Sequence, residues 1–355
     1  MYSYEQLHTF AKKIFIAIGH TEELAASAAD VLISADIRGV DSHGIARLKG
    51  YVRLWEVDRI NAKPNIQIVH ETPSTATIDA DAALGLVAGP RAMQVAIDKA
   101  KQVGTGWVSV KNSNHYGIAG FHSMMALEED MIGISLTNAS PLVAPTFGKE
   151  RMLGTNPISV AIPTLNETPF IADMATTTAA NGKLEVLQRK KEDAPLGWIQ
   201  DGDGTPTSNA HGVKEGGALL PLGGDREHAS HKGYILGSIV DIFSAVLSGA
   251  NYGPWVPPFV SFIDPVADPV GEGLGHFFGA MRVDAFRPKE EFLRHMDQWV
   301  ARFRQTTPID PNVPVQIPGD YERGMEAERL KNGIPVLDAV IADLNELGAK
   351  FGVKL

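Results

Sequence analysis

Apolar residues recur at helical spacing in three segments at the start of the chain, over residues 3–19, 21–39 and 42–55. Each segment begins with a serine or threonine that can cap a helix, and Ser3 and Gln6 have the spacing of a capping box. The first two segments each end at a glycine, a residue common after the last turn of a helix. The pattern therefore predicts a helical region at the N-terminus.

From about residue 74 the pattern changes to short β-rich runs that alternate with helical segments. We expect strands at 75–80, 107–110, 132–138, 158–162, 170–173 and 277–283, and helices at 92–103 and 121–130. A strand, a helix and a second strand in this order indicate a right-handed crossover between parallel strands. The sequence thus predicts an α/β region after the helical one.

The later segments are less regular. Residues 189–231 are rich in charge, Gly and Asp without a sustained period, which predicts a long surface excursion. Residues 232–248 carry little charge and predict a buried helix, and residues 252–275 form a loop rich in Pro and Gly. Further helices are expected at 289–304, 320–331 and 337–347.

Composition narrows the class of protein. The chain has 355 residues, 44% hydrophobic and 21% charged, and its formal net charge of −10 disfavours nucleic acid and anionic membranes as partners. It has no cysteine, which excludes disulfides and thiolate metal sites and fits a cytoplasmic protein. The N-terminus lacks a signal-peptide pattern, and the longest apolar stretch, residues 235–250, is too short to span a membrane.

Several common motifs are absent. The sequence contains no G-x-G-x-x-G, no P-loop, no G-x-S-x-G and no H-E-x-x-H, so a Rossmann fingerprint, a serine-hydrolase elbow and a zinc-protease site are all disfavoured. His228 and His231 stand close together in a loop without a companion ligand. We therefore interpret them as solvated and predict no metal site.

The segment DSHGIARL carries the first candidate chemistry. His43 and Arg47 are four residues apart at an expected helix start, so their side chains should point to the same side. An Arg fork matches a carboxylate, and a helix N-terminus adds amide donors, which together suit a small organic anion. A surface Arg beside a helix-start His is the structural alternative.

The segment NSNHYG places His115 in the loop at the carboxyl end of an expected strand, where open α/β sheets bind ligands. The next strand leads to Asn138 and Ser140, and a third to residues 173–176. A loop histidine that titrates near neutrality suits proton transfer in carbonyl reduction or alcohol oxidation. A hydrogen-bonded structural histidine is the alternative reading.

Two further segments are candidates for cofactor contacts. Lys232, in HKGY just ahead of an apolar helix, could meet a phosphate or a ribose hydroxyl, although a lysine at such a position is more often simply solvated. In the turn IPGDYE, Asp320 could simply cap the next helix.

Read together, these segments resemble the non-Rossmann malate/L-lactate dehydrogenase family, which includes sulfolactate and ureidoglycolate dehydrogenases. Seven fragments in order carry the resemblance: DIRGVDSHGIARL (36–48), NSNHYG (112–117), FGKERMLGTNPIS (147–159), DMATT (173–177), HKGY (231–234), GHFFGAMRVDAF (275–286) and IPGDYERG (317–324). The resemblance implies a three-layer α/β/α mixed sheet with a helical domain built from both chain ends. The expected domains are residues 1–73 with 305–355, for substrate binding and dimerisation, and 74–304, for NAD(P) binding.

The resemblance also implies an activity, which is NAD(P)-dependent hydride transfer between a 2-hydroxy acid and its 2-oxo acid. NAD is the first choice over NADP, and a homodimer is expected. His115 would exchange the proton, with His43 as the second candidate, while Arg47 holds the substrate carboxylate with Ser42 beside it. The implied cofactor contacts are Ser140, Asp173, Met174, Ala175, Thr176, Lys232, Gly233, Gly319, Asp320 and Tyr321.

Two alternatives remain open. One is an NADPH-dependent reductase of cyclic-imine carboxylates, which would use the same anion clamp. The other is a binder of carboxylates or nucleotides without catalytic activity. The long segments before Lys232 and at 253–271 could reshape the mouth of the substrate site, so the sequence does not select one acid.

Overall fold

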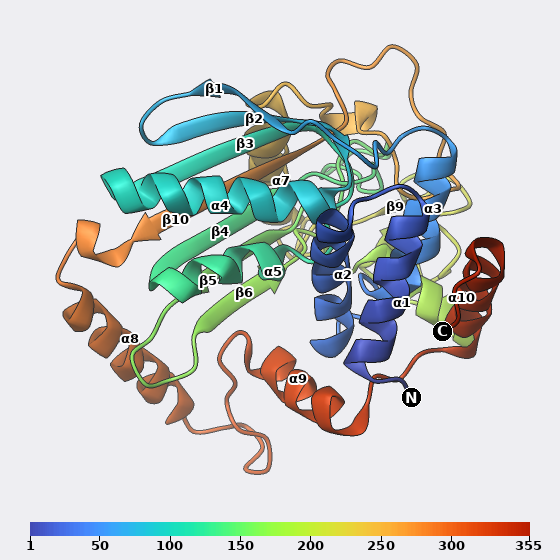
Figure 1. Cartoon of the computed structure of the whole chain (residues 1–355). Coiled ribbons are helices and arrows are strands. Elements are labelled where there is room, and N and C mark those ends of the chain that lie inside the picture. The colour runs from blue at the N-terminus through green and yellow to red at the C-terminus, as the bar shows by residue number, and fades with distance from the viewer.

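The computed structural model describes residues 1–355 and is built around a seven-stranded sheet (Figure 1). In spatial order the strands are β1 (Gln67–Glu71), β2 (Thr75–Ala83), β3 (Thr105–Ser113), β10 (Leu274–Arg282), β4 (Met131–Thr137), β5 (Ile158–Ile162) and β6 (Phe170–Met174). The six strands expected from the sequence are all present, with β1 in addition. The mixed α/β fold class is therefore confirmed.

Strand direction decides which ends of the strands meet. β2 and β3 pair in parallel across α4 (Gly85–Val103), as the crossover pattern predicted, and every other neighbouring pair is antiparallel. β10 lies between β3 and β4, so these two strands run in the same direction without touching each other. It follows that β3, β4 and β6 end at the same edge of the sheet.

Both faces of the sheet are covered by helices. Adjacent residues of a strand point to opposite faces, and Phe278 packs in the main core with α4, whereas Phe277 packs with Val240 on the other side. The first face carries α4, α5 (Ala119–Met124) and the 3-10 helix η2 (Met125–Glu129), and the opposite face carries α7 (Ser230–Asp241) and its π-helical continuation η3 (Ile242–Val246). Figure 1 shows α4 and α5 across the near face and α7 behind the sheet.

The helix expected at 232–248 is present as α7 and η3, but the prediction that it is buried was wrong. Val240 and Ala245 face the sheet and are buried, whereas the outer side is apolar and open to solvent. That side carries Ile235, Ile239, Ile242, Phe243, Val246 and Leu247, each 42% to 60% exposed. A run of apolar residues with few charges does not distinguish a helix buried all round from one with an uncovered apolar face.

α9 (Asp320–Asn332) and α10 (Asp338–Phe351) from the C-terminal end of the chain pack against the N-terminal helices beside the sheet, whereas α8 (Lys289–Arg304) lies apart from them. The N-terminal helices are α1 (Tyr4–Ala17), α2 (Glu22–Ile37), η1 (Ile45–Arg47) and α3 (Leu48–Glu56). The capping box at Ser3 and Gln6 is present, and α10 packs against both α1 and α3. One continuous core joins α1, α2, α3 and α10 to α4 and β3, and the domain division at residues 73 and 304 stays a prediction.

Three local features differ from the sequence analysis. Ser42 does not cap a helix, because the turn before α3 is the 3-10 helix η1, which begins after Gly44. The excursion at 189–231 contains a small sheet, β8 (Pro206–Thr207), β7 (Ile199–Gln200) and β9 (Ala218–Leu219), and follows an unexpected helix, α6 (Asn181–Lys190). Two short 3-10 helices, η4 (Gly253–Trp255) and η5 (Val283–Ala285), were also not expected.

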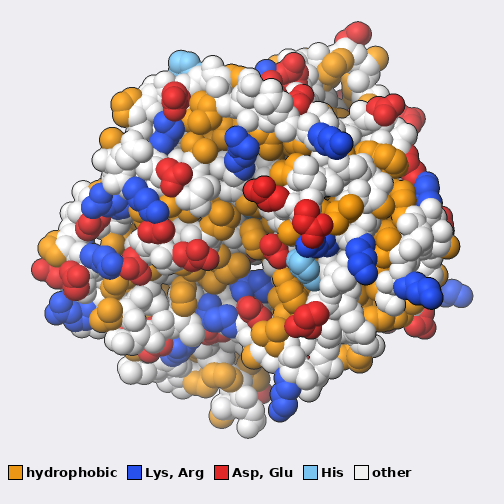
Figure 2. Space-filling model, in the orientation of Figure 1, with side chains coloured by type: hydrophobic (Ala, Val, Ile, Leu, Met, Phe, Trp, Pro, Cys, Tyr) orange, Lys and Arg blue, Asp and Glu red, His pale blue; other side chains and the backbone are white.

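Acidic and basic side chains are interspersed over the face seen in Figure 2. No helix combines the length and the apolar character that crossing a membrane requires.

Candidate active site

The ends of β3 and β4 are tied together across β10. The His276 ring hydrogen-bonds with Ser113 Oγ at 2.8 Å and with Thr137 Oγ1 at 2.7 Å. Asn138 adds a second link, because its Oδ1 accepts the Gly275 N–H at 3.0 Å. Burial lowers the pKa of His276 to about 3, so this bridge stays neutral at physiological pH. The loops that follow both strands are thereby held in fixed positions.

Four residues selected from the sequence line one cavity at this edge of the sheet. His115 follows β3 and Ser140 follows β4, while His43 and Arg47 come from the segment before α3. The cavity, which we call the inner cavity, has a volume of about 70 Å³. The expected convergence of loops is therefore confirmed for His115 and Ser140, and the helical region supplies the other side of the cavity.

The two histidines lie side by side. Their ring centroids are 5.6 Å apart with an interplanar angle of 25°, and Ser42 Oγ hydrogen-bonds with His43 Nδ1 at 2.9 Å. Surrounding protein withdraws both rings from water, which lowers the pKa of His43 to about 4 and the pKa of His115 well below its usual value. The nearby Arg47 charge lowers both further. Both imidazoles are therefore neutral at pH 7 and can accept a proton.

Tyr51, on α3, orients His115. Its hydroxyl lies 2.7 Å from His115 Nδ1, and the Gly117 nitrogen lies 3.4 Å from the same atom. The Tyr51 hydroxyl can donate to Nδ1 or accept from it, so this contact is compatible with either neutral tautomer of the ring. When Nδ1 carries the hydrogen and donates it to Tyr51, Nε2 on the far side of the ring is free to accept a proton.

Arg47 is fixed on one side and free on the other. Its Nε donates to the Ser42 carbonyl at 2.5 Å, and its Nη2 lies 3.8 Å from Glu185 Oε2. The distance to Glu185 is long for a charge-assisted hydrogen bond, so the terminal nitrogens retain donor capacity toward a ligand. A carboxylate in the inner cavity would complete the coordination of this guanidinium.

Phe259 forms a wall of the inner cavity. Its ring centroid is 4.8 Å from that of His115 and 6.0 Å from Arg47 Cζ. Ser140 Oγ accepts the Phe259 N–H at 2.8 Å, and the Arg53 guanidinium donates to the Phe259 carbonyl. A residue from the Pro-rich loop is therefore held in place from two different elements.

A second group of expected residues lines another cavity, of about 420 Å³, between the end of β6 and the start of α9. Asp173, Met174, Gly319 and Tyr321 contribute to it. Asp173 accepts the Gly120 N–H at 2.7 Å, and packing around its carboxyl group raises its pKa to about 6. The cavity offers a carboxylate beside an exposed aromatic ring, a combination that suits a ribose and a base.

Comparison with known proteins places the chain in a family. The sequence profile of the malate/L-lactate dehydrogenase family matches residues 2–345. Malate dehydrogenase of Pyrococcus abyssi is 43% identical over 351 residues, 99% of this chain and 94% of that protein. L-sulfolactate dehydrogenase of Methanocaldococcus jannaschii is 38% identical, over 97% of this chain and 96% of that protein. The solved malate dehydrogenase of Pyrococcus horikoshii matches with a TM-score of 0.89 at 41% identity, over 99% of this chain and 96% of that chain.

The chain belongs to the malate/L-lactate dehydrogenase family. The resemblance drawn from the seven fragments is confirmed, and so is an oxidoreductase of the hydroxy acid dehydrogenase type. A nicotinamide cofactor follows from this class of enzyme.

Two of the expected cofactor residues are glycines in tight packing. At the start of α9, Gly319 (φ +98°) packs tightly against β6, because a Cβ on it would lie 3.0 Å from Ile171 Cβ. Beside α7, the Leu222 N–H donates to the Thr176 carbonyl at 2.9 Å. A Cβ added to Gly233 would lie 2.3 Å from the same Leu222 nitrogen. Only glycine fits either position, because each is buried against other atoms of the protein.

Two expected cofactor residues sit differently from their predicted places. Lys232 is exposed in the first turn of α7 rather than ahead of the helix. Asp320 is the first residue of α9 and not its cap, because Gly319 holds the cap position. The Asp320 carboxylate pairs with Arg304 and Arg323, so it shapes the turn and does not line the cavity.

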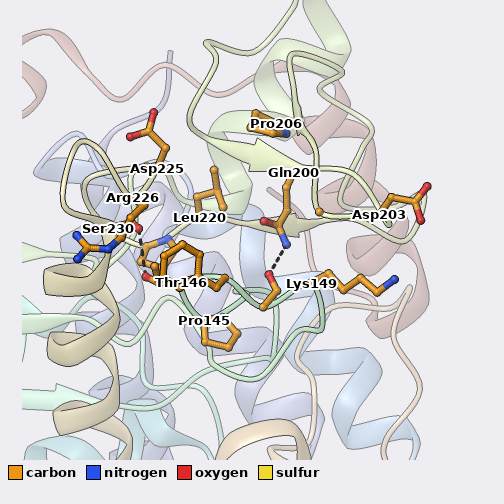
Figure 3. A pocket seen from close by; sticks show the side chains of 15 residues that line it. Pro145, Thr146, Lys149, Gln200, Asp203, Pro206, Leu220, Asp225, Arg226 and Ser230 are labelled. Atoms are coloured by element: carbon orange, nitrogen blue, oxygen red, sulfur yellow. Dashed lines mark hydrogen bonds between the residues drawn. The ribbon is translucent and has the colours of Figure 1, made fainter.

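A third depression, of about 380 Å³, opens beside the first turn of α7 (Figure 3). Thr146 and Ser230 hydrogen-bond at 3.1 Å on one side of it, and Gln200 Nε2 donates to the Gly148 carbonyl at 2.9 Å on the other. It contains none of the residues selected from the sequence.

Sequence reasoning missed three residues of the inner cavity region: Tyr51, Phe259 and Glu185. Tyr51 lies four residues after Arg47, so the helical spacing already placed it on the same side of α3. Phe259 and Glu185 come from a loop and from an unexpected helix, and no local pattern links them to Arg47.

Proposed function

We propose that the chain interconverts a 2-hydroxy acid of the malate or lactate type and its 2-oxo acid, with NAD or NADP as hydride carrier and NAD as the first choice. The observation that carries this proposal is that Arg47, His43 and His115 line one small cavity at the edge of the sheet. An anion-binding fork beside neutral imidazoles is what a 2-hydroxy carboxylate requires.

In this proposal each side chain has one task. Arg47 binds the carboxylate, with Ser42 fixing the guanidinium through its carbonyl. In oxidation the unprotonated Nε2 of His115 accepts the hydroxyl proton while Nδ1–H donates to the Tyr51 hydroxyl, and the imidazolium formed returns this proton to the carbonyl oxygen in reduction. His43, stacked beside it, is the alternative proton carrier. Tyr51 orients His115 by its hydrogen bond to Nδ1. The chain's contribution is orientation together with an acid–base group of suitable pKa.

The cofactor contacts are proposed from the family resemblance together with the geometry. A bound nicotinamide would supply or accept the hydride. The residues proposed to hold the cofactor are Ser140, Asp173, Met174, Ala175, Thr176, Lys232, Gly233, Gly319 and Tyr321, with Asp320 supporting the turn. The choice between NAD and NADP and a cytoplasmic location stay predictions.

We propose a homodimer that buries the outer side of α7 and η3. Six large apolar side chains on this side recur at helical spacing from Ile235 to Leu247. An exposed apolar stripe of this kind is typical of an interface between subunits, and two copies of one helix can pair across a two-fold axis.

A substrate panel crossed with both cofactors tests the function. Malate, lactate and sulfolactate are offered with NAD and with NADP, and Δ1-piperideine-2-carboxylate with each reduced cofactor, while the absorbance of the reduced nicotinamide is followed. Turnover of a 2-hydroxy acid supports the proposal. Exclusive turnover of the cyclic imine supports the reductase alternative, and cofactor binding without any turnover supports a binder that lacks catalytic activity.

A further inference from the structure

A larger cavity adjoins the inner cavity and is separated from it by Phe259. This outer cavity has a volume of about 320 Å³ and lies between α3, the start of α6 and the Pro-rich loop. Arg47, Phe259 and Val260 line both cavities. A substrate whose carboxylate contacts Arg47 in the inner cavity therefore lies next to the outer cavity, because Arg47 lines both.

The outer cavity is strongly basic within an acidic protein. Arg47, Lys49, Arg53 and Lys214 line it against one acidic residue, Glu185, although the whole chain carries a net charge of −10. A basic cavity on an acidic protein concentrates small anions locally, since the field of opposite sign is focused there.

Two of these cations lack an acidic partner. Lys49 is neutralised by Asp343 and Glu346, at 2.8 and 2.7 Å. Arg53 donates to the Phe259 carbonyl, and Lys214 Nζ donates to the neutral Gln188 amide at 2.7 Å, but neither forms an ion pair. Arg53 is half-buried and Lys214 is exposed, so both cationic groups are open to an anionic ligand that would supply the missing counter-ion.

We propose that Arg53 and Lys214 bind a second anionic group of the substrate, a carboxylate or a sulfonate, and so make a second negative charge the basis of substrate selection. This inference rests on the proposed function, because it assigns the 2-hydroxy carboxylate end of the acid to the inner cavity. The second group then lies past Phe259 in the outer cavity. Acids without a second anionic group cannot form the contact with Lys214, so we expect them to bind more weakly.

The variant Lys214→Gln tests the subsite. Glutamine keeps a polar side chain near Gln188 and removes the charge. The matched control is Lys13→Gln, which removes the same charge from an exposed position on α1 that forms no ion pair. KM and kcat are measured for malate and for lactate with wild type and both variants.

Lys214→Gln is expected to raise KM for the dianion malate about tenfold, because a hydrogen bond to a charged group is lost, and to change KM for lactate less than about twofold. Lys13→Gln is expected to change neither. An unchanged KM for malate, or an equal rise for both acids, overturns the subsite while leaving the proposed function intact.

A binding measurement separates the two proposals. Malonate, a dianion without an oxidisable hydroxyl, is titrated calorimetrically into wild type and Lys214→Gln. If no acid is turned over, the proposed function fails, and weaker malonate binding by Lys214→Gln alone still supports the subsite. Equal malonate affinity in both proteins, or no binding to wild type, overturns it.

Discussion

Gly50 allows the Phe259 ring to lie against α3, and Gly50→Ala tests how firmly that ring is fixed. An added Cβ would lie 2.5 Å from Phe259 Cζ and 2.9 Å from Cε1. Ordinary contacts begin near 3.4 Å, so the ring has to move by roughly 1 Å. The same ring packs 4.8 Å from His115, and its backbone is tied to Ser140 and Arg53.

Two effects on the free energy of unfolding oppose each other. Alanine in a helix interior is more favourable than glycine by about 1 kcal/mol. Overpacking of a fixed ring costs about 1–3 kcal/mol, so we expect Gly50→Ala to leave stability unchanged or to lower it by up to about 2 kcal/mol. A misplacement of roughly 1 Å near the reacting groups lowers kcat/KM by up to about a hundredfold.

The measurement combines steady-state kinetics on the preferred hydroxy acid with denaturant unfolding. The matched control is Gly324→Ala on α9, where an added Cβ meets nothing within 4 Å, so it should gain stability and keep full activity. If Gly50→Ala gains as much stability as the control and keeps wild-type kcat/KM, the Phe259 wall is not fixed and the reasoning is refuted.

Three further predictions follow from the site and the α7 surface. Tyr51→Phe should lower kcat roughly three- to tenfold through the lost hydrogen bond to His115, without changing the affinity for cofactor; an unchanged kcat and pH profile would show that the hydroxyl does not orient the ring. Because the pKa of His115 is depressed, it stays neutral as the pH falls, so kcat/KM for oxidation at saturating cofactor should stay level from about pH 8 to about 6.5 and decline only below that; a decline centred at or above about pH 7 contradicts this. Ile239→Asp, in the exposed apolar stripe, should yield monomers in sedimentation or light scattering, whereas an unchanged oligomeric mass would exclude α7 as the interface.

Local patterns were enough for the parts of the fold that depend on neighbouring residues. The caps of α1 and α2 were readable because a Ser or Thr side chain meets an N–H three residues away. The position of β10 was not readable, because its pairing with both β3 and β4 joins segments more than a hundred residues apart. Single-sequence patterns carry no information on such pairings.

In the site too, the residues that local patterns place could be predicted, and the contacts between distant segments could not. His115 and Ser140 could be placed together because strands that run in the same direction end at the same edge. The contact between Phe259 and His115 could not be predicted, since it depends on the path of a Pro-rich loop. The exposure of α7 was misjudged for a related reason, because nothing in the sequence shows which side of that helix the sheet covers.

The turnover of His115→Asn, measured together with its affinity for reduced cofactor, tests the central claim most directly. Asparagine keeps a polar side chain but cannot take up a proton. With proton transfer by His115, turnover of the hydroxy acid should fall by roughly 10²- to 10⁴-fold while the reduced cofactor binds as tightly as to wild type. Turnover close to that of wild type would show that the acid is not oxidised at this histidine.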